Sequence, residues 1–254
     1  SILSVLCGTI YCMNSREFHN ALANDASFLV AAHELKTPLS IIRQLSLTLS
    51  DREIQLGESE VRRISAQIDL TTERALRLVT DLTKVAKLED AMFQLEPINA
   101  RRICSDIVDD MSEAYRLNGR NLILKPANYN KNHSLLALAN YDLLRAILLN
   151  FSDNALYSSV EKTNVEVSVQ SIKNSIRISV RDYGESLPLS IWRSIKKQNC
   201  QPVVASSRPQ SSGLGIYIAH NFAQAMNGEI GVIRHRDGNT FYVDLMSSEQ
   251  LSLL

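Results

Sequence analysis

The chain has 254 residues, of which 45% are apolar, enough for two domains of ordinary size with a core each. Its 27 basic residues are matched by 27 acidic residues, so it has no net field to attract a phosphate backbone, and nucleic-acid binding is not expected. The four cysteines are scattered and form no Cys-x-x-Cys pair, which is typical of a reducing compartment.

The beginning of the chain is uncharged through Met13, and its first residue is Ser1. Thirteen residues cannot cross a bilayer, which needs about twenty, but they fit the end of a truncated transmembrane helix as well as an ordinary packed helix. Residues 1–27 are therefore expected to be an N-terminal signalling helix or a juxtamembrane segment.

Two heptad-like patterns predict a helical hairpin over residues 28–93. Apolar residues follow four-three spacing from Phe28 to Leu49, and they alternate three-four from Val61 to Val85. A polar stretch that contains Gly57 separates the two patterns. Two antiparallel helices with one narrow apolar seam each cannot bury both seams against one another, so we expect a homodimeric four-helix bundle.

The heptads stop after Pro97, and a domain boundary is expected at residues 93–98. Four short segments alternate apolar and polar residues and predict two hairpins, Val165–Val169 with Ile176–Val180 and Glu229–Ile233 with Thr240–Leu245. Their expected turns are Ser171–Ser175 and Asp237-Gly238, and two further segments, Tyr141–Ser159 and Leu214–Met226, have helical patterns. Residues 98–254 are thus expected to form an α+β domain with a mostly antiparallel sheet.

His33 lies on the first predicted helix, one residue and so about 100° away from the seam residue Ala32. Its imidazole is therefore expected in solvent. Thr37 shares its face, and Glu34 can hold one ring nitrogen so that the other acts as a nucleophile. Pro38 removes the hydrogen bond to the Glu34 carbonyl and should bend the helix there. Taken alone, a helical histidine is more often an ordinary surface residue.

Asn150 and Asn154 are one turn apart on a helix that is otherwise apolar. Their amide oxygens could bind Mg²⁺, while structural hydrogen bonding is the alternative. Asp182 and Gly184 follow a predicted strand, where Asp182 could accept a hydrogen bond from an exocyclic amine, although most Asp-x-Gly triplets are only turns.

Gly213-Leu214-Gly215 opens the last predicted helix, and its backbone N–H groups could bind phosphate with help from the helix dipole. A Gly-x-Gly triplet alone is weak support for such a site.

The order and spacing of these motifs, from about residue 28 to residue 246, resemble those of bacterial two-component sensor histidine kinases. The seven residues from His33 to Leu39, His-Glu-Leu-Lys-Thr-Pro-Leu, are similar to the phosphoacceptor box of that family. The resemblance implies a dimerisation and histidine-phosphotransfer domain at residues 28–93. It implies an ATP-binding domain of the Bergerat type, an α/β sandwich shared with gyrase and the Hsp90 chaperones, at residues 98–254.

The resemblance also implies roles for the motif residues. His33 would be the phosphoacceptor, Glu34 its activating acid or base, and Thr37 the residue that positions water for dephosphorylating a regulator. ATP and Mg²⁺ would be the cofactors, and their ligands fall into three groups: Asn150 and Asn154 near the metal, Asp182 and Gly184 at the adenine, and Gly213 and Gly215 at the phosphates.

The implied activity is autophosphorylation of His33 with ATP, followed by transfer to an aspartate in the receiver domain of a response regulator, with dephosphorylation of that regulator as a second activity. The chain would be the cytoplasmic portion of a protein anchored in the inner membrane upstream. Whether the reaction runs within one subunit or between two depends on the loop between the helices, which the sequence of Ser50–Ser59 does not reveal.

Three departures from the family pattern affect the nucleotide domain. Tyr157 stands where the asparagine box usually has a lysine, and Ser186 replaces the second glycine of the Asp-x-Gly-x-Gly element, although a Cβ disfavours positive φ and close backbone approach. Residues 191–198 lack the usual phenylalanine-rich box, so the lid over ATP, about residues 193–212, is unusual. Three residues could supply replacement charge, namely Lys196, Lys197 and Arg208.

These departures keep two alternatives open. One is a degenerate kinase that acts mainly as a response-regulator phosphatase. The other is a dimeric signalling adaptor without catalysis.

Overall fold

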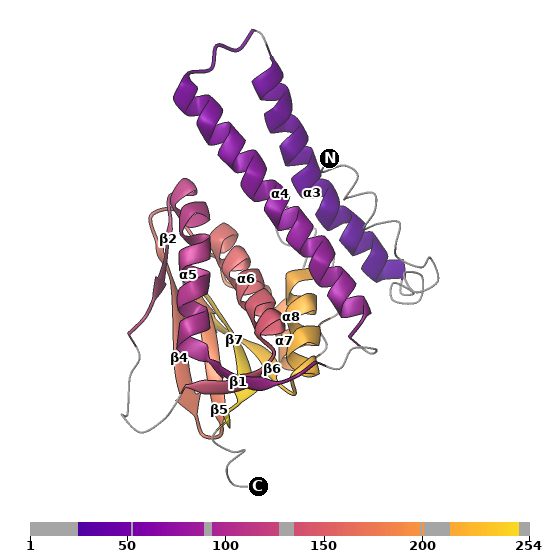
Figure 1. Ribbon diagram of the computed structural model, residues 1–254, viewed down its shortest axis with the longest axis vertical. Coiled ribbons are helices and arrows are strands. Elements are labelled where there is room, and N and C mark those ends of the chain that lie inside the picture. The colour runs from indigo at the N-terminus through magenta and orange to yellow at the C-terminus, as the bar shows by residue number, and fades with distance from the viewer. Residues whose placement is uncertain are drawn as a thin grey trace. The chain divides into compact units, whose positions relative to one another are not determined.

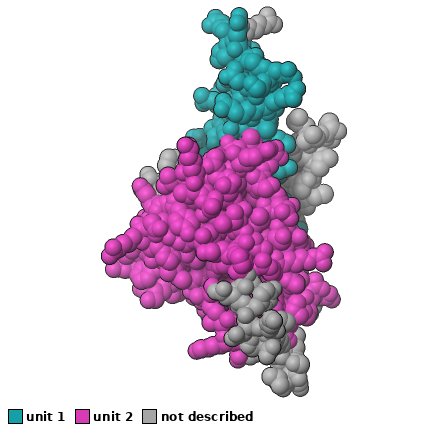
Figure 2. All heavy atoms as spheres, turned by 90° about the vertical axis from the view of Figure 1, so that its left-hand side faces the viewer, with its two compact units in different colours: residues 1–91 teal, residues 92–254 magenta. Residues whose placement is uncertain are grey.

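The computed structural model describes residues 25–51, 53–88, 93–126, 135–198, 200 and 214–248. It divides into two compact units, residues 1–91 and residues 92–254 (Figure 2). The predicted signalling segment, residues 1–27, lies outside the described residues except for its last three. None of the described helices combines the length and the apolar character needed to cross a lipid bilayer.

The first unit contains a helical hairpin made of α3 (Asp25–Ser50) and α4 (Glu58–Ala86), which lie side by side (Figure 1). Both predicted helices are confirmed and are longer than the heptads indicate. Helix α4 begins with half of a capping box: the side chain of Glu60 accepts a hydrogen bond of 3.0 Å from the backbone N–H of Gly57, which has no side chain to complete the motif. Acidic residues in this first turn also complement the positive end of the helix dipole.

Burial along α3 differs from the predicted seam. Ala32 and Leu39 were expected in the seam, but Ala32 is exposed and the side chain of Leu39 is 59% exposed. Val30 and Ala31 are buried instead. The heptad pattern alone does not tell which apolar positions face the other helix of the hairpin, because a helix that packs on two partners carries apolar residues toward both.

The second unit is built on a five-stranded sheet with the order β2-β4-β5-β7-β6. These strands are β2 (Asn121–Leu124), β4 (Asn164–Ile172), β5 (Ser175–Arg181), β7 (Gly238–Met246) and β6 (Glu229–His235). The β2–β4 pair is parallel and the other pairs are antiparallel. A separate pair joins β1 (Glu96–Asn99) to β3 (Leu136–Ala139). The predicted α+β class with a mostly antiparallel sheet is thus confirmed.

Three helices cover one face of this sheet (Figure 1): α5 (Ala100–Leu117), α6 (Tyr141–Ser158) and α8 (Leu214–Ala225). The short helix α7 (Leu189–Lys196) contacts β6. Alternate strand residues point toward the helices and are buried, among them Val165, Val167, Val169, Ile176, Ile178, Val180, Phe241, Val243 and Leu245. The period-two pattern seen in the sequence therefore marks the core face.

The first hairpin turn is shorter than predicted, and the second begins one residue earlier than predicted. Pairing in the first hairpin continues to Ile172 and Ser175, so only Lys173 and Asn174 form the turn, with Lys173 at φ 53°. In the second hairpin Gly238 opens β7 at φ +133°. Helix α5, helix α7 and strands β1 to β3 were not predicted, although Asn99 caps α5 by accepting hydrogen bonds from two backbone N–H groups.

Candidate functional site

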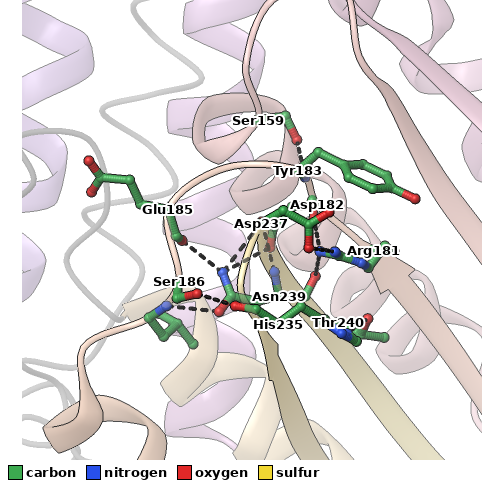
Figure 3. A network of polar contacts seen from close by, with 11 residues as sticks. Ser159, Arg181, Asp182, Tyr183, Glu185, Ser186, His235, Asp237, Asn239 and Thr240 are labelled. Atoms are coloured by element: carbon green, nitrogen blue, oxygen red, sulfur yellow. Dashed lines mark hydrogen bonds and ion pairs between the residues drawn. The ribbon is translucent and has the colours of Figure 1, made fainter.

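Asp182 follows directly after β5 and is only 1% exposed. Its backbone N–H donates to the carbonyl of Asn239 at 2.9 Å, and its Oδ1 accepts from the backbone N–H of Asn239 at 3.0 Å (Figure 3). The Asn239 side chain adds contacts from Nδ2 to Oδ1 at 3.4 Å and to Oδ2 at 3.3 Å. A buried carboxylate needs such donors, because an unpaired charge in the interior is costly.

Gly184 presses against the end of α6. A Cβ at this position would overlap the carbonyl oxygen of Ser158, so no other residue fits without a shift of the backbone. The neighbouring Tyr183 is tied to the same helix end, since its N–H donates to the Ser159 hydroxyl at 3.1 Å and its carbonyl accepts from Val160 at 2.8 Å. The loop after Asp182 is therefore fixed to the C-terminus of α6.

Ser186 occupies the position where a second glycine was expected, and its backbone is not strained. Among the described residues that are not glycine, positive φ occurs at Lys162, Lys173, Gln198 and Asn227. The Ser186 hydroxyl donates to the carbonyl of His235 in β6 (Figure 3). The positive φ that a Cβ would disfavour does not occur at Ser186.

Two titratable side chains flank this loop. Burial raises the pKa of Tyr183, and the nearby Glu166 carboxylate raises it further. Burial lowers the pKa of His235 below its usual value, with a further contribution from the Arg181 guanidinium. Both groups are therefore uncharged at neutral pH, and neither places a new charge beside Asp182.

Asn150, Asn154 and Gly215 come together where α6 packs on α8. A Cβ at Gly215 would lie 3.2 Å from Oδ1 of Asn150 and 3.6 Å from Nδ2 of Asn154. Asn150 Nδ2 also donates to the carbonyl of Ala146 at 2.9 Å, which is a structural hydrogen bond of the kind foreseen as the alternative. Gly213 lies outside the described residues. The asparagine face of α6 and the start of α8 thus meet at one place.

A single line of residues on α6 connects these two groups. Asn150, Asn154 and Ser158 are spaced by four residues and so lie on one face of the helix. The side chains of the first two lie beside Gly215 in α8, and the backbone carbonyl of Ser158 lies against Gly184, two residues after Asp182. Helix α6 therefore places the expected phosphate end and the expected adenine end of the site.

The asparagine pair supplies few ligands for a cation. Among the described residues there is no group of three or more His, Cys, Asp and Glu side chains that could hold a metal ion. Mg²⁺ requires about six oxygen ligands and usually keeps waters and takes substrate phosphates. The residues present fit Mg²⁺ that is bound together with nucleotide phosphates.

His33, Glu34 and Thr37 lie on α3 in the first unit. The side chain of His33 is exposed, as expected, whereas Glu34 and Thr37 are half-buried. The Thr37 hydroxyl donates to the carbonyl of His33 at 3.3 Å, which fixes the threonine on the histidine's side of the helix. The imidazole is therefore open to a reaction partner.

Some of the residues that depart from the family pattern lie within the described structure. The Tyr157 side chain is 38% exposed. Lys196 and Lys197 are exposed, and Lys196 Nζ lies 5.1 Å from the centre of the Trp192 ring. Arg208 and most of the predicted lid lie outside the described residues.

Asn239 is the residue that the sequence did not single out. It is 1% exposed and occupies a core-facing position in β7, in line with Phe241, Val243 and Leu245. Asparagine is depleted in strands, and a polar residue at a core-facing position needs a partner. That combination is the signal that could have identified it.

One family description, "Histidine kinase-, DNA gyrase B-, and HSP90-like ATPase", matches residues 139–249. The hybrid signal transduction histidine kinase K of Dictyostelium discoideum is 27% identical over 234 residues, which is 86% of this chain and 19% of that protein. The chain spans less than half the length of the curated relatives it was compared with.

Two solved structures share this fold. The histidine kinase ThkA in complex with the response regulator protein TrrA aligns with a TM-score of 0.61 at 17% identity, covering 92% of this chain and 64% of that one. Full-length ShkA in complex with AMPPNP aligns with a TM-score of 0.55 at 20% identity, covering 86% of this chain and 45% of that one.

The contact of Gly184 with α6 predicts a large effect of a single methyl group. Gly184→Ala should lower the free energy of unfolding by about 3 kcal/mol or more, because its Cβ would overlap backbone. Gly119→Ala is the control, since Gly119 has φ +66° but no atom within 4 Å of an added Cβ, and should cost about 1–2 kcal/mol. Urea unfolding measures both, and equal losses would contradict the tight contact at Gly184.

Proposed function

Because the chain is the catalytic core of a two-component sensor histidine kinase, we propose that it transfers the γ-phosphoryl group of ATP to His33 and then to an aspartate of a response regulator. The observation that carries this proposal is the pairing of an exposed histidine on a helical hairpin with a nucleotide domain whose Asp182 carboxylate is buried and held. An ATP domain without an exposed acceptor would support only an ATPase.

In the nucleotide domain, Asp182 accepts a hydrogen bond from the exocyclic amine of adenine, and Gly184 lets the loop at the adenine end pack against the carbonyl of Ser158. The start of α8 at Gly215 directs backbone N–H groups and the positive end of the helix dipole at the phosphates. Asn150 and Asn154 would hold Mg²⁺ together with those phosphates, and the ion would supply positive charge that offsets the phosphate charge. The AMPPNP bound to ShkA, a protein of the same fold, supports nucleotide binding at such a domain.

In the hairpin, a ring nitrogen of His33 attacks the γ-phosphorus in line with the leaving oxygen of ADP. A nitrogen–phosphorus bond forms, the bond to the β–γ bridging oxygen breaks, and ADP leaves with that oxygen. Glu34, the next residue, accepts the proton of the other ring nitrogen and stabilises the charge on the ring. Most of the catalysis is positioning, because phosphoryl transfer needs little covalent help from the protein.

The second partner is the receiver domain of a response regulator, whose aspartate takes the phosphoryl group from His33. ThkA, a structural neighbour, forms a complex with the response regulator protein TrrA, and this supports the same kind of partner here. Thr37 lies on the histidine's side of α3, where its hydroxyl can orient water for dephosphorylating the bound regulator.

A degenerate kinase that works mainly as a phosphatase is the second candidate, favoured by Tyr157 at the usual lysine position.

The hairpin has apolar residues on its surface that a second copy of the chain would cover. Leu39, Leu47, Leu76 and Val79 are each 38% to 59% exposed. Soluble chains rarely expose so many large apolar side chains on one element unless a partner covers them. We infer that two copies of the chain form a homodimeric four-helix bundle. We also propose that the chain is the cytoplasmic portion of a protein anchored in the inner membrane by a segment upstream.

Phosphorylation of His33 predicts a defined chemical signature. The 254-residue chain incubated with γ-labelled ATP and Mg²⁺ should take up label that is labile in acid and stable in alkali, as a phosphoramidate is. His33→Gln should reduce the label to background, because the acceptor nitrogen is gone, and His133→Gln should label like the wild type.

Label that persists in His33→Gln would contradict the assignment of the acceptor. A wild-type chain that binds ADP without taking label would favour the second candidate, and loss of label from a pre-phosphorylated regulator would then distinguish a phosphatase from an adaptor. A chain that binds no adenine nucleotide would contradict the proposed function.

The bundle proposal predicts that Leu76→Glu weakens dimerisation at least about tenfold, because a carboxylate would be buried without a partner in the dimer interface. Gln67→Glu is the matched control: Gln67 is exposed and lies nine residues before Leu76, about 180° around α4. Sedimentation equilibrium measures both dissociation constants. A wild-type monomer, or equal effects of the two variants, would contradict the bundle.

A further inference from the structure

Asn239 connects three segments around Asp182. Its backbone pairs with the end of β5, where it exchanges hydrogen bonds of 2.9 Å and 3.0 Å with the backbone and the carboxylate of Asp182. Its side chain reaches the loop that follows, since Nδ2 donates to the carbonyl of Glu185 at 3.1 Å and Oδ1 accepts from the N–H of Leu187 at 2.8 Å (Figure 3). One residue thus contacts both Asp182 and the loop that follows it.

These contacts fix which way the amide of Asn239 points. The N–H of Leu187 can only donate, so it requires the amide oxygen. The carboxylate of Asp182 and the carbonyl of Glu185 can only accept, so they require the amide nitrogen. The two sides of the amide are therefore assigned by three independent neighbours, and the donor side faces Asp182.

A carboxylate on a short side chain can turn about two torsions, and its direction decides which ligand group it can meet. Asn239 limits both torsions of Asp182, because its backbone N–H and its Nδ2 contact the same carboxylate from a rigid strand. Gly238 keeps this arrangement close, since a Cβ there would overlap the carbonyl oxygen of Asp182. Because the carboxylate is already held in this direction, less free energy is lost in ordering it when the ligand binds.

We propose that Asn239 is the positioning residue for recognition of the adenine amine, which rests on the proposed contact between Asp182 and adenine. Asn239 sets the direction of the Asp182 carboxylate and keeps it an acceptor, so that the site selects a base with an exocyclic amine. Asn239 itself acts through Asp182 and the loop 185–187.

The sharpest variant is Asn239→Asp, which has nearly the same shape. An aspartate keeps the oxygen that accepts from Leu187, but it places a second carboxylate oxygen where a donor faced Asp182. Two carboxylates about 3.3 Å apart do not both ionise easily, so the pair holds one shared proton. Asn239→Ala is the second variant, which removes the side chain without adding charge.

The readout is the preference for an amine. The dissociation constants of ADP and of purine riboside 5′-diphosphate, which has hydrogen in place of the amine, are measured with the full chain and Mg²⁺ by calorimetry. The wild type should bind ADP about 10-fold or more tightly than the analogue, the effect of one hydrogen bond to a charged group. In both variants the ratio should fall below about threefold, because Asp182 no longer points at the amine.

Asn118→Ala is the matched control. Asn118 is half-buried and its Nδ2 donates to the carbonyl of Ala114 at 2.8 Å, at the end of α5, so its loss removes a comparable hydrogen bond outside the proposed site. Its ratio should equal that of the wild type.

The outcomes separate the two claims. A wild-type ratio near unity contradicts the contact of Asp182 with the amine, and with it the proposed function of that residue. A large wild-type ratio that is unchanged in Asn239→Asp and Asn239→Ala overturns the role of Asn239 and leaves that of Asp182 intact. Equal weakening of both ligands in the variants, with the ratio preserved, marks a structural role only and also overturns the proposal.

A measurement on the wild type covers the case in which neither variant folds. The side-chain amide signals of Asn239 are followed by NMR while ADP or the analogue is added at saturation. ADP should shift these signals more than the analogue does, because only ADP engages the carboxylate that the amide contacts. Equal shifts with the two ligands overturn the proposal.

Discussion

The buried carboxylate of Asp182 governs the arrangement of the second unit. A charge that is 1% exposed stays in the interior only if donors surround it, and two of these come from Asn239. Supplying them requires β5 and β7 to be neighbours in register and requires a residue without a side chain at Gly238, beside the Asp182 backbone. The pairing of β5 with β7 and the glycine at position 238 thus supply what the Asp182 side chain needs.

Helix α6 extends this arrangement across the domain. The side chains of Asn150 and Asn154 lie beside Gly215 at the start of α8, and the backbone carbonyl of Ser158, at the end of α6, lies against Gly184. A nucleotide is polar at its phosphates and flat and apolar at its base, so a site for it needs different chemistry at two ends that are held at a fixed separation. A helix is stiff, and its C-terminal half provides that separation.

The hairpins and the long helices could be predicted from the sequence because burial of one face leaves a regular pattern, as in the alternating valines of β4 and the heptads of α4. Asp182, Gly184 and Asn154 could be singled out as candidates because the local order of their motifs is distinctive, and their roles in binding stay predictions. Asn239 could not, because its meaning lies in a bond to Asp182, 57 residues away in the chain. The exposure of Ala32 and Leu39 was missed for a similar reason: a heptad shows that a position is apolar and does not show which partner covers it.

The most direct test of this account is a crystal structure of the full chain with ADP and Mg²⁺. The account predicts the exocyclic amine of adenine within about 3 Å of an Asp182 carboxylate oxygen, with the phosphates directed toward Gly215 and the two asparagines of α6. A nucleotide bound elsewhere, or one whose amine faces away from Asp182 while the carboxylate keeps its contacts with Asn239, would contradict it.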